Sequence, residues 1–153
     1  MCDILTGNSP ENLMTATYNA QLVRDFFTAV AAGNLPDELL TDDMTFWSVN
    51  SGESTRARFQ GAARLLSAAY GGTLEYLVDY CVEEGNRIVA EIRSQGTLIS
   101  GDKLQNNHVF IFTIENGRIA SAREYMDQLP VREKIVPVLQ QLGLEAMGSK
   151  TSD

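Results

Sequence analysis

The sequence predicts an α+β domain, in which a curved antiparallel sheet carries helices on one face. Two helical blocks precede a run of consecutive strand-like segments, an order typical of this fold class. The dipeptide Asn116-Gly117 separates two β-rich runs and is a strong hairpin signal. The 153 residues, 44% of them hydrophobic, suffice for one core. We expect a single domain over residues 1–153, with flexible tails at 1–8 and 148–153.

The start of the chain predicts a long amphipathic helix. Ser9 is placed to cap this helix, Pro10 suits its first turn, and Gly33 is expected to end it. Between these limits, apolar residues recur at helical spacing: Leu22, Val23, Phe26, Phe27 and Val30.

Three short elements and a second helix are expected next. They are a helical turn over 36–40, a strand over 44–49 that carries the only tryptophan, Trp47, and a polar loop over 51–58. The second helix is expected to end at Gly71-Gly72. It is marked by Phe59, Leu65, Leu66, Ala69 and Tyr70.

The second half predicts four strands and a closing helix. Strands over 73–83 and 87–99 are joined at Gly85-Asn86, and a turn at Gly101-Asp102 leads into the central hairpin. A helix over 130–142 is expected to end at Gly143.

The hairpin turn decides which side chains meet the only histidine, His108. A two-residue turn places His108 opposite Tyr125 and directs Glu124 to the other face of the sheet. A three-residue loop with a left-handed Gly117 places His108 opposite Glu124. We favour the second register, because it gives a buried histidine a carboxylate neighbour and pairs large with small residues. Those large–small pairs are Phe110 with Ala122 and Phe112 with Ala120.

Two further turns complete a predicted pocket face. A two-residue turn at Gly101-Asp102 places Arg93 opposite Phe110, and one at Gly85-Asn86 places Glu91 opposite Tyr80. Ionisable residues from three strands then converge on an apolar surface. The predicted face consists of Tyr76, Val78, Tyr80, Glu91, Arg93, Gln95, His108, Phe110, Phe112, Ala122, Glu124 and Met126.

Charge and cysteine content indicate which partners and which cellular compartment to expect. The formal charge of −8 argues against a nucleic-acid or anionic-membrane surface. Cys2 and Cys81 do not form a disulfide framework, which favours a reducing, cytoplasmic compartment. No signal-peptide pattern opens the chain, and no apolar run approaches the roughly 20 residues of a membrane span. We therefore expect neither nucleic acid nor membrane as a partner.

The order of elements and the segment Phe-Thr-Ile-Glu-Asn-Gly-Arg-Ile-Ala-Ser-Ala-Arg-Glu-Tyr-Met-Asp (112–127) resemble the nuclear transport factor 2-like superfamily. SnoaL-like and ketosteroid-isomerase-like small-molecule enzymes are the most similar members. The segments Val-Ala-Ala-Gly-Asn (30–34) and Thr-Asp-Asp-Met-Thr-Phe (41–46) are similar as well. The resemblance covers 19–136. It implies a cone of curved sheet and helices around an apolar pocket, commonly dimeric through the sheet.

The resemblance also narrows the chemistry. Where ketosteroid isomerases have their base, an Asp, this chain has Ser48, and where they have an oxyanion-hole Tyr it has Phe26, so their mechanism is disfavoured. Glu124 matches the last acid of limonene-epoxide-hydrolase-like enzymes. Glu91 and Arg93 supply the acid and arginine that those enzymes carry two apart, but in reversed order.

Four residues are the candidate catalytic groups. His108 and Glu124 are predicted to form an acid–base pair, as the His and Asp of dehydratase members do. Arg93 is predicted to orient a substrate oxygen or stabilise an oxyanion, with Glu91 as a further acid. The structural alternatives are a satisfied core histidine and an ion pair between Glu124 and Arg93. A hydrophobic ligand is expected to contact Phe26, Trp47, Tyr76, Tyr80, Phe110, Phe112 and Met126.

Two functions follow from this pattern. The first is an enzyme of isomerase, cyclase, dehydratase or epoxide hydrolase type, acting on a small hydrophobic, cyclic substrate. The alternative is a non-catalytic module of the same fold that binds a hydrophobic ligand or a protein. No zinc spacing, phosphate loop or dinucleotide fingerprint is present, so we expect no metal or cofactor. Asp127 is predicted to cap the last helix, and Asp42-Asp43 to serve a cap or turn rather than a metal.

Overall fold

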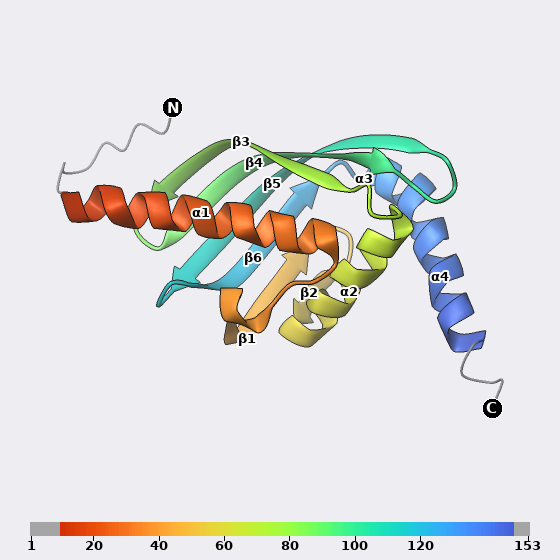
Figure 1. Cartoon of the computed structure of the whole chain (residues 1–153), viewed down its shortest axis with the longest axis horizontal. Coiled ribbons are helices and arrows are strands. Elements are labelled where there is room, and N and C mark those ends of the chain that lie inside the picture. Colours follow the sequence, from red (N-terminus) through yellow and green to blue (C-terminus); the bar gives the residue numbers. More distant parts are fainter. Residues whose placement is uncertain (1–9, 149–153) are drawn as a thin grey trace.

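The computed structural model describes the backbone of residues 10–148 and the side chains of residues 18–143. The predicted cap at Ser9 and the predicted tails, apart from Gly148, lie outside these residues. A curved sheet carries helices on one face, which confirms the α+β class (Figure 1). No helix of the described chain is long and apolar enough to cross a membrane.

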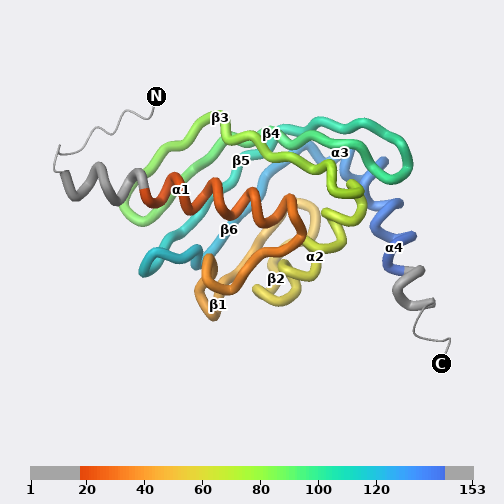
Figure 2. Tube along the Cα trace, viewed as in Figure 1, coloured from red at the N-terminus to blue at the C-terminus, as the bar shows by residue number. Residues whose placement is uncertain are grey.

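The helices begin and end largely where the sequence predicts. The first helix, α1 (Pro10–Ala32), crosses the sheet and stops at Gly33, whose φ of 69° is the left-handed conformation that glycine tolerates (Figure 2). A 3₁₀ turn, η1 (Asp37–Leu39), follows as expected. The second helix, α2 (Arg56–Ala69), is capped by Thr55, whose hydroxyl accepts a hydrogen bond from a backbone N–H of the first turn.

The predicted polar loop over 51–58 is wrong. It contains a strand, β2 (Gly52–Thr55), paired antiparallel with β1 (Leu40–Ser48), and the first turn of α2. Because β2 is a short polar edge strand, it lacks the apolar alternation that marks a strand in sequence. The sheet order is β2-β1-β6-β5-β4-β3, and β1 lies parallel to β6, so the predicted all-antiparallel pairing holds only for the other neighbours.

The remaining elements follow in chain order. The strands are β3 (Glu75–Glu84), β4 (Arg87–Thr97), β5 (Lys103–Glu115) and β6 (Arg118–Met126). A continuous helical run then closes the chain as α3 (Gln128–Pro130), a π-helical turn η2 (Val131–Ile135) and α4 (Val136–Gly148). The predicted stop at Gly143 is wrong, because α4 continues through this residue.

A β-bulge in β3 changes which face of the sheet the side chains on either side of it point to. The two-residue turn at Gly85-Asn86 and the pairing of Tyr80 with Glu91 are as predicted. Asp79 is an extra residue between the paired positions, so the register shifts by one residue beyond it. Tyr76 therefore faces the helices, whereas Tyr80 faces outward and is 45% exposed.

The connection from β4 to β5 is longer than predicted. Residues 98–102 form the loop, in which the Leu98 N–H donates to the Asp102 carbonyl at 2.8 Å. The Leu98 side chain is buried against the closing helical run, which holds the longer loop in place. As a result Arg93 lies opposite Asn107, and the predicted pairing of Arg93 with Phe110 is wrong.

The central hairpin combines parts of both candidate registers. Asn116 and Gly117, with φ of 50° and 74°, form a two-residue turn, so the favoured three-residue loop is wrong. A bulge at Ala120 then shifts β6 by one residue, which places His108 opposite Met126. That shift returns Glu124 to the face of His108, and the predicted shared face is confirmed.

Gly96 permits a close approach between the sheet and the end of α2. An added Cβ at Gly96 would lie 2.7 Å from Cδ1 of Tyr70 and 3.1 Å from the Thr73 carbonyl oxygen. A methyl at Gly143 in α4 would meet open space.

We expect Gly96→Ala to lower the free energy of unfolding by about 1–3 kcal/mol, because the methyl overpacks the contact with Tyr70. Gly143→Ala should raise it by roughly 0.5–1 kcal/mol, because alanine restricts the unfolded chain. Urea unfolding followed by circular dichroism measures both variants. Equal stability of Gly96→Ala and the parent protein would contradict the close contact.

Candidate functional site

Polar side chains gather at one end of the helix-facing side of the sheet. Alternation along β4 buries Ser94 in line with Ile92 and Ala90, and alternation along β5 buries His108 in line with Phe110. The other end of this face is apolar. The sheet thus carries a polar patch beside a hydrophobic core.

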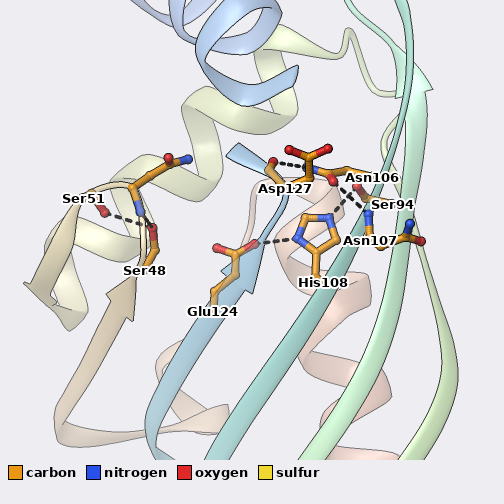
Figure 3. Close-up of polar contacts among 9 residues, drawn as sticks. Ser48, Ser51, Ser94, Asn106, Asn107, His108, Glu124 and Asp127 are labelled. Carbon is orange, nitrogen blue, oxygen red and sulfur yellow. Dashed lines mark hydrogen bonds and ion pairs between the residues drawn. The ribbon is translucent and has the colours of Figure 1, made fainter. Parts of the chain in front are cut away.

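His108 links two neighbouring strands through both ring nitrogens. Its Nδ1 lies 2.9 Å from Oε1 of Glu124 on β6, and its Nε2 lies 2.7 Å from Oγ of Ser94 on β4 (Figure 3). Because an ionised carboxylate only accepts hydrogen bonds, the ring proton belongs on Nδ1. In the neutral imidazole Nε2 then accepts from the Ser94 hydroxyl. The three groups thus form a series of hydrogen bonds from Ser94 through His108 to Glu124.

These three hydrogen-bonded side chains are well shielded from water. The side chains of His108 and Glu124 are 7% and 13% exposed, and Ser94 is buried. Within the described residues, every fully buried side-chain nitrogen or oxygen has a hydrogen-bond partner. The structure also records no hydrogen bond from a described residue to the second carboxylate oxygen of Glu124.

Asn106 ties the polar patch to the closing helical run. Its side-chain amide donates to the Asp127 carbonyl at 3.0 Å (Figure 3). The Asp127 carboxylate accepts from the Leu129 N–H, so the predicted cap is confirmed. The end of β6 and the start of the helices are thereby fixed relative to His108.

Ser48 lies beside Glu124 on the other side. The parallel pairing of β1 and β6 places the two residues next to each other. The Ser48 hydroxyl accepts from the Asn50 N–H at 3.1 Å and lies 3.4 Å from Oγ of Ser51 (Figure 3). Ser48 thus belongs to a small hydroxyl cluster where β1 ends.

A cavity of about 430 Å³ lies over the polar patch. This volume falls in the range of small-molecule sites, and most of its lining is apolar. Sheet residues form its floor, α1 and α2 form one side, and the closing helical run forms another. The polar lining includes Ser48, Ser94, Asn106, His108 and Glu124.

Four of the predicted ligand contacts line the cavity, and three do not. Phe26, Tyr76, Phe110 and Met126 line it, although their contact with a ligand stays a prediction. Phe112 is instead packed in the core against Phe26, at 5.2 Å between ring centroids. Trp47 and Tyr80 lie on the outer face of the sheet, since the strand alternation and the Asp79 bulge direct them outward.

Arg93 and Glu91 are also on the outer face, so the predicted convergence with His108 is wrong for both. Arg93 makes a two-pronged ion pair with Asp79, with both N–O distances at 2.7 Å. The hydrogen bond from Arg93 lowers the pKa of the Asp79 carboxyl. The predicted alternative partner of Arg93, Glu124, is held by His108 instead. Glu91 is exposed between Tyr80 and Val109.

Sequence reasoning missed Ser94, Asn106 and Tyr70. Ser94 continues the alternation Ile88, Ala90, Ile92, which is a usable signal that it points inward. The five-residue loop over 98–102, which decides the pairing of Ser94 with Asn106, has no sequence signature. Tyr70 follows α2 at its carboxyl end and reaches the cavity from there.

Two phenols supply protonated donors to the cavity. Burial, and then the negative charges of Glu124 and of Tyr70 when ionised, raise the pKa of Tyr76 well above its usual 10.0. Burial also raises the pKa of Tyr70. Both hydroxyls therefore remain protonated at neutral pH, so they are able to donate hydrogen bonds to an oxygen atom.

A family model described as the SnoaL-like domain matches residues 23–122. No curated protein matches the sequence. A candidate SnoaL-like polyketide cyclase from Jannaschia sp. CCS1 superposes with a TM-score of 0.66 at 19% identity, over 76% of this chain and 90% of that chain. An NTF2-like protein from Anabaena variabilis superposes with a TM-score of 0.68 at 22% identity, over 80% of this chain and 95% of that chain. AclR, a candidate hydroxylase from Streptomyces galilaeus, superposes with a TM-score of 0.66 at 16% identity, over 80% of this chain and 96% of that chain. These likenesses establish the nuclear transport factor 2-like fold.

The raised pKa of Tyr76 predicts an alkaline loss of stability. Above pH 10 the unfolded chain releases the Tyr76 proton while the folded chain retains it, so stability falls as pH rises. We expect Tyr76→Phe to make this decline shallower by up to about 1.4 kcal/mol per pH unit. Urea unfolding between pH 8 and about pH 11 measures the slope. An unchanged slope in the variant would show that Tyr76 ionises equally in both states.

Proposed function

The chain belongs to the family of SnoaL-like domains, and on that premise we propose that it is an enzyme that transforms a small hydrophobic molecule by acid–base chemistry. The observation that carries this proposal is the hydrogen bond between His108 and Glu124 at the floor of an apolar cavity. The reaction is of isomerase, cyclase, dehydratase or epoxide hydrolase type. A cyclic substrate of a few rings suits a cavity of about 430 Å³.

Glu124 is the proposed proton acceptor. Both ring nitrogens of His108 are already bonded within the protein, so the carboxylate offers the more accessible lone pairs. His108 holds one carboxylate oxygen of Glu124, and Glu124 lines the cavity, so the other oxygen is the proposed acceptor. The role of His108 is thus to position the base and to share its proton.

Tyr76 is the proposed partner of the substrate oxygen. Removal of a proton next to a carbonyl leaves negative charge on the carbonyl oxygen, which a fixed donor stabilises. A protonated phenol serves this purpose, and Tyr76 lines the same cavity as Glu124. This pairing of base and donor favours proton transfer at carbon, as in a cyclase or isomerase. The likeness to a candidate SnoaL-like polyketide cyclase supports the same class.

The charge of Glu124 is the first feature to test. We expect Glu124→Gln to reduce kcat/KM roughly 10²–10⁴-fold, since the amide keeps the shape but does not accept a proton. Glu115→Gln, at the exposed end of β5, is the matched control and should keep full activity. Turnover of cyclic ketones and epoxides, followed by chromatography, provides the assay.

The non-catalytic alternative gives a different result in the same experiment. A binding module holds a hydrophobic compound that is recovered unchanged after prolonged incubation. Glu124→Gln would then alter affinity alone, and the enzymatic proposal would be wrong. Circular dichroism spectra that match the parent protein exclude misfolding as the cause.

We further propose that a second copy of the chain covers the outer face of the sheet. Exposed apolar residues of four neighbouring strands adjoin there in register, an arrangement that a monomer leaves in water. The family resemblance implies the same dimer. The exposed apolar residues are Tyr80, Val82, Val89, Val109 and Tyr125.

Sedimentation equilibrium tests the dimer directly. We expect a mass of twice the 16.8 kDa chain, and Val109→Asp should convert it to the monomer, because a buried unpaired carboxylate opposes association. Glu115→Gln should leave the mass unchanged. A parent protein that sediments as a monomer at high micromolar concentration would remove the proposal.

A further inference from the structure

We propose that Ser94 is a nucleophile and that Ser94, His108 and Glu124 form a catalytic triad for acyl transfer from hydrophobic esters. This activity goes beyond the proposed proton transfer at carbon. It uses the same cavity, but its chemistry starts at a different atom. Each activity is measured by its own assay.

The geometry of the three groups carries the proposal. Oγ of Ser94 lies 2.7 Å from Nε2 of His108, and Nδ1 of His108 lies 2.9 Å from the Glu124 carboxylate (Figure 3). A nucleophilic serine needs a base within hydrogen-bond reach and a third group that orients the base. The carboxylate holds the ring proton on Nδ1, which leaves the Nε2 lone pair directed at the serine hydroxyl.

Burial and location distinguish this serine from the others near the site. Ser94 is 5% exposed, lines the cavity, and makes its recorded side-chain hydrogen bond with His108. Ser48 also lines the cavity, but its hydroxyl is engaged with Asn50 and Ser51 rather than with a base. A serine that merely satisfied a core histidine would not need an apolar cavity beside it.

The reaction balances without any further co-reactant. The Ser94 oxygen attacks the ester carbonyl carbon while its proton passes to Nε2 of His108. The C–O bond to the alcohol then breaks, and the imidazolium returns the proton to the departing alkoxide. Water attacks the acyl-serine in the same way, which releases the carboxylic acid and restores the hydroxyl.

The transition-state oxyanion has side-chain donors rather than backbone donors. Ser94 lies inside β4, where ladder pairing with β3 and β5 occupies the strand. The phenols of Tyr70 and Tyr76 line the same cavity and supply O–H donors. An ester with a good leaving group, such as a p-nitrophenyl ester, acylates faster than its acyl-serine is hydrolysed, so we expect the acyl-enzyme to accumulate with such a substrate.

Covalent labelling is the decisive experiment. The full chain is treated with an alkyl fluorophosphonate and, separately, with p-nitrophenyl butyrate, and intact mass and peptide mapping locate the adduct. We expect one adduct on Ser94, none in Ser94→Ala, and labelling slowed roughly 10²–10⁴-fold in Glu124→Gln. Ser121→Ala, on the outer face of the same sheet, should label as the parent protein does.

The mapped position keeps the test decisive even where a variant folds poorly. No adduct on the parent protein, or an adduct on any residue other than Ser94, would overturn the proposal. The two activities fail separately as well. Labelling at Ser94 without turnover of ketones or epoxides would support the triad alone, whereas turnover without labelling would support proton transfer alone.

Discussion

The hydrogen bond between His108 and Glu124 is the interaction on which the site depends. A carboxylate on the helix-facing side of a sheet costs several kcal/mol to desolvate unless a partner compensates it. His108 is that partner, and its own second nitrogen is satisfied by Ser94. The polar patch therefore persists beside a core of packed phenylalanines, and no buried side-chain nitrogen or oxygen in the described part of the chain lacks a hydrogen-bond partner.

Two β-bulges make this arrangement possible. With a two-residue turn and no bulge at Ala120, Glu124 would point to the outer face and His108 would be left without a carboxylate. Without the bulge at Asp79, Tyr76 would likewise face outward, in line with Tyr80. Arg93 forms two hydrogen bonds with the Asp79 carboxylate on the outer face of the sheet. A residue outside the cavity thus helps to hold the bulge that turns Tyr76 inward. The ion pair is exposed, and its value lies in fixing the bulge rather than in overall stability.

Sequence reasoning recovered the fold and half of the site, for reasons that particular residues illustrate. The Asn116-Gly117 turn, the helix limit at Gly33 and the apolar alternation are local signals, and each predicted its element. The shared face of His108 and Glu124 is predicted correctly although the predicted register is wrong. The assumed three-residue loop and the actual bulge at Ala120 each add one residue to the hairpin, and either one turns Glu124 to the face of His108. Arg93 and Glu91 were misplaced because the length of the loop over 98–102 depends on the burial of Leu98, a tertiary contact. Arg93 and Glu91 alternate along β4 with the buried residues Ile88, Ala90 and Ile92, and this local pattern does indicate the outer face.

The polar patch and the cavity wall are joined through the end of β6. Asn106 holds the Asp127 carbonyl, and the Asp127 side chain caps the helical run that walls the cavity. We therefore expect changes in η2 and α4 to reshape the cavity while His108 and its partners stay in place on the sheet. In the enzyme proposed above, the floor supplies the proton transfer and the wall selects the substrate. On this proposal one fold can host many reactions, because the catalytic groups lie on strands and the selective wall is a helical segment that can change independently.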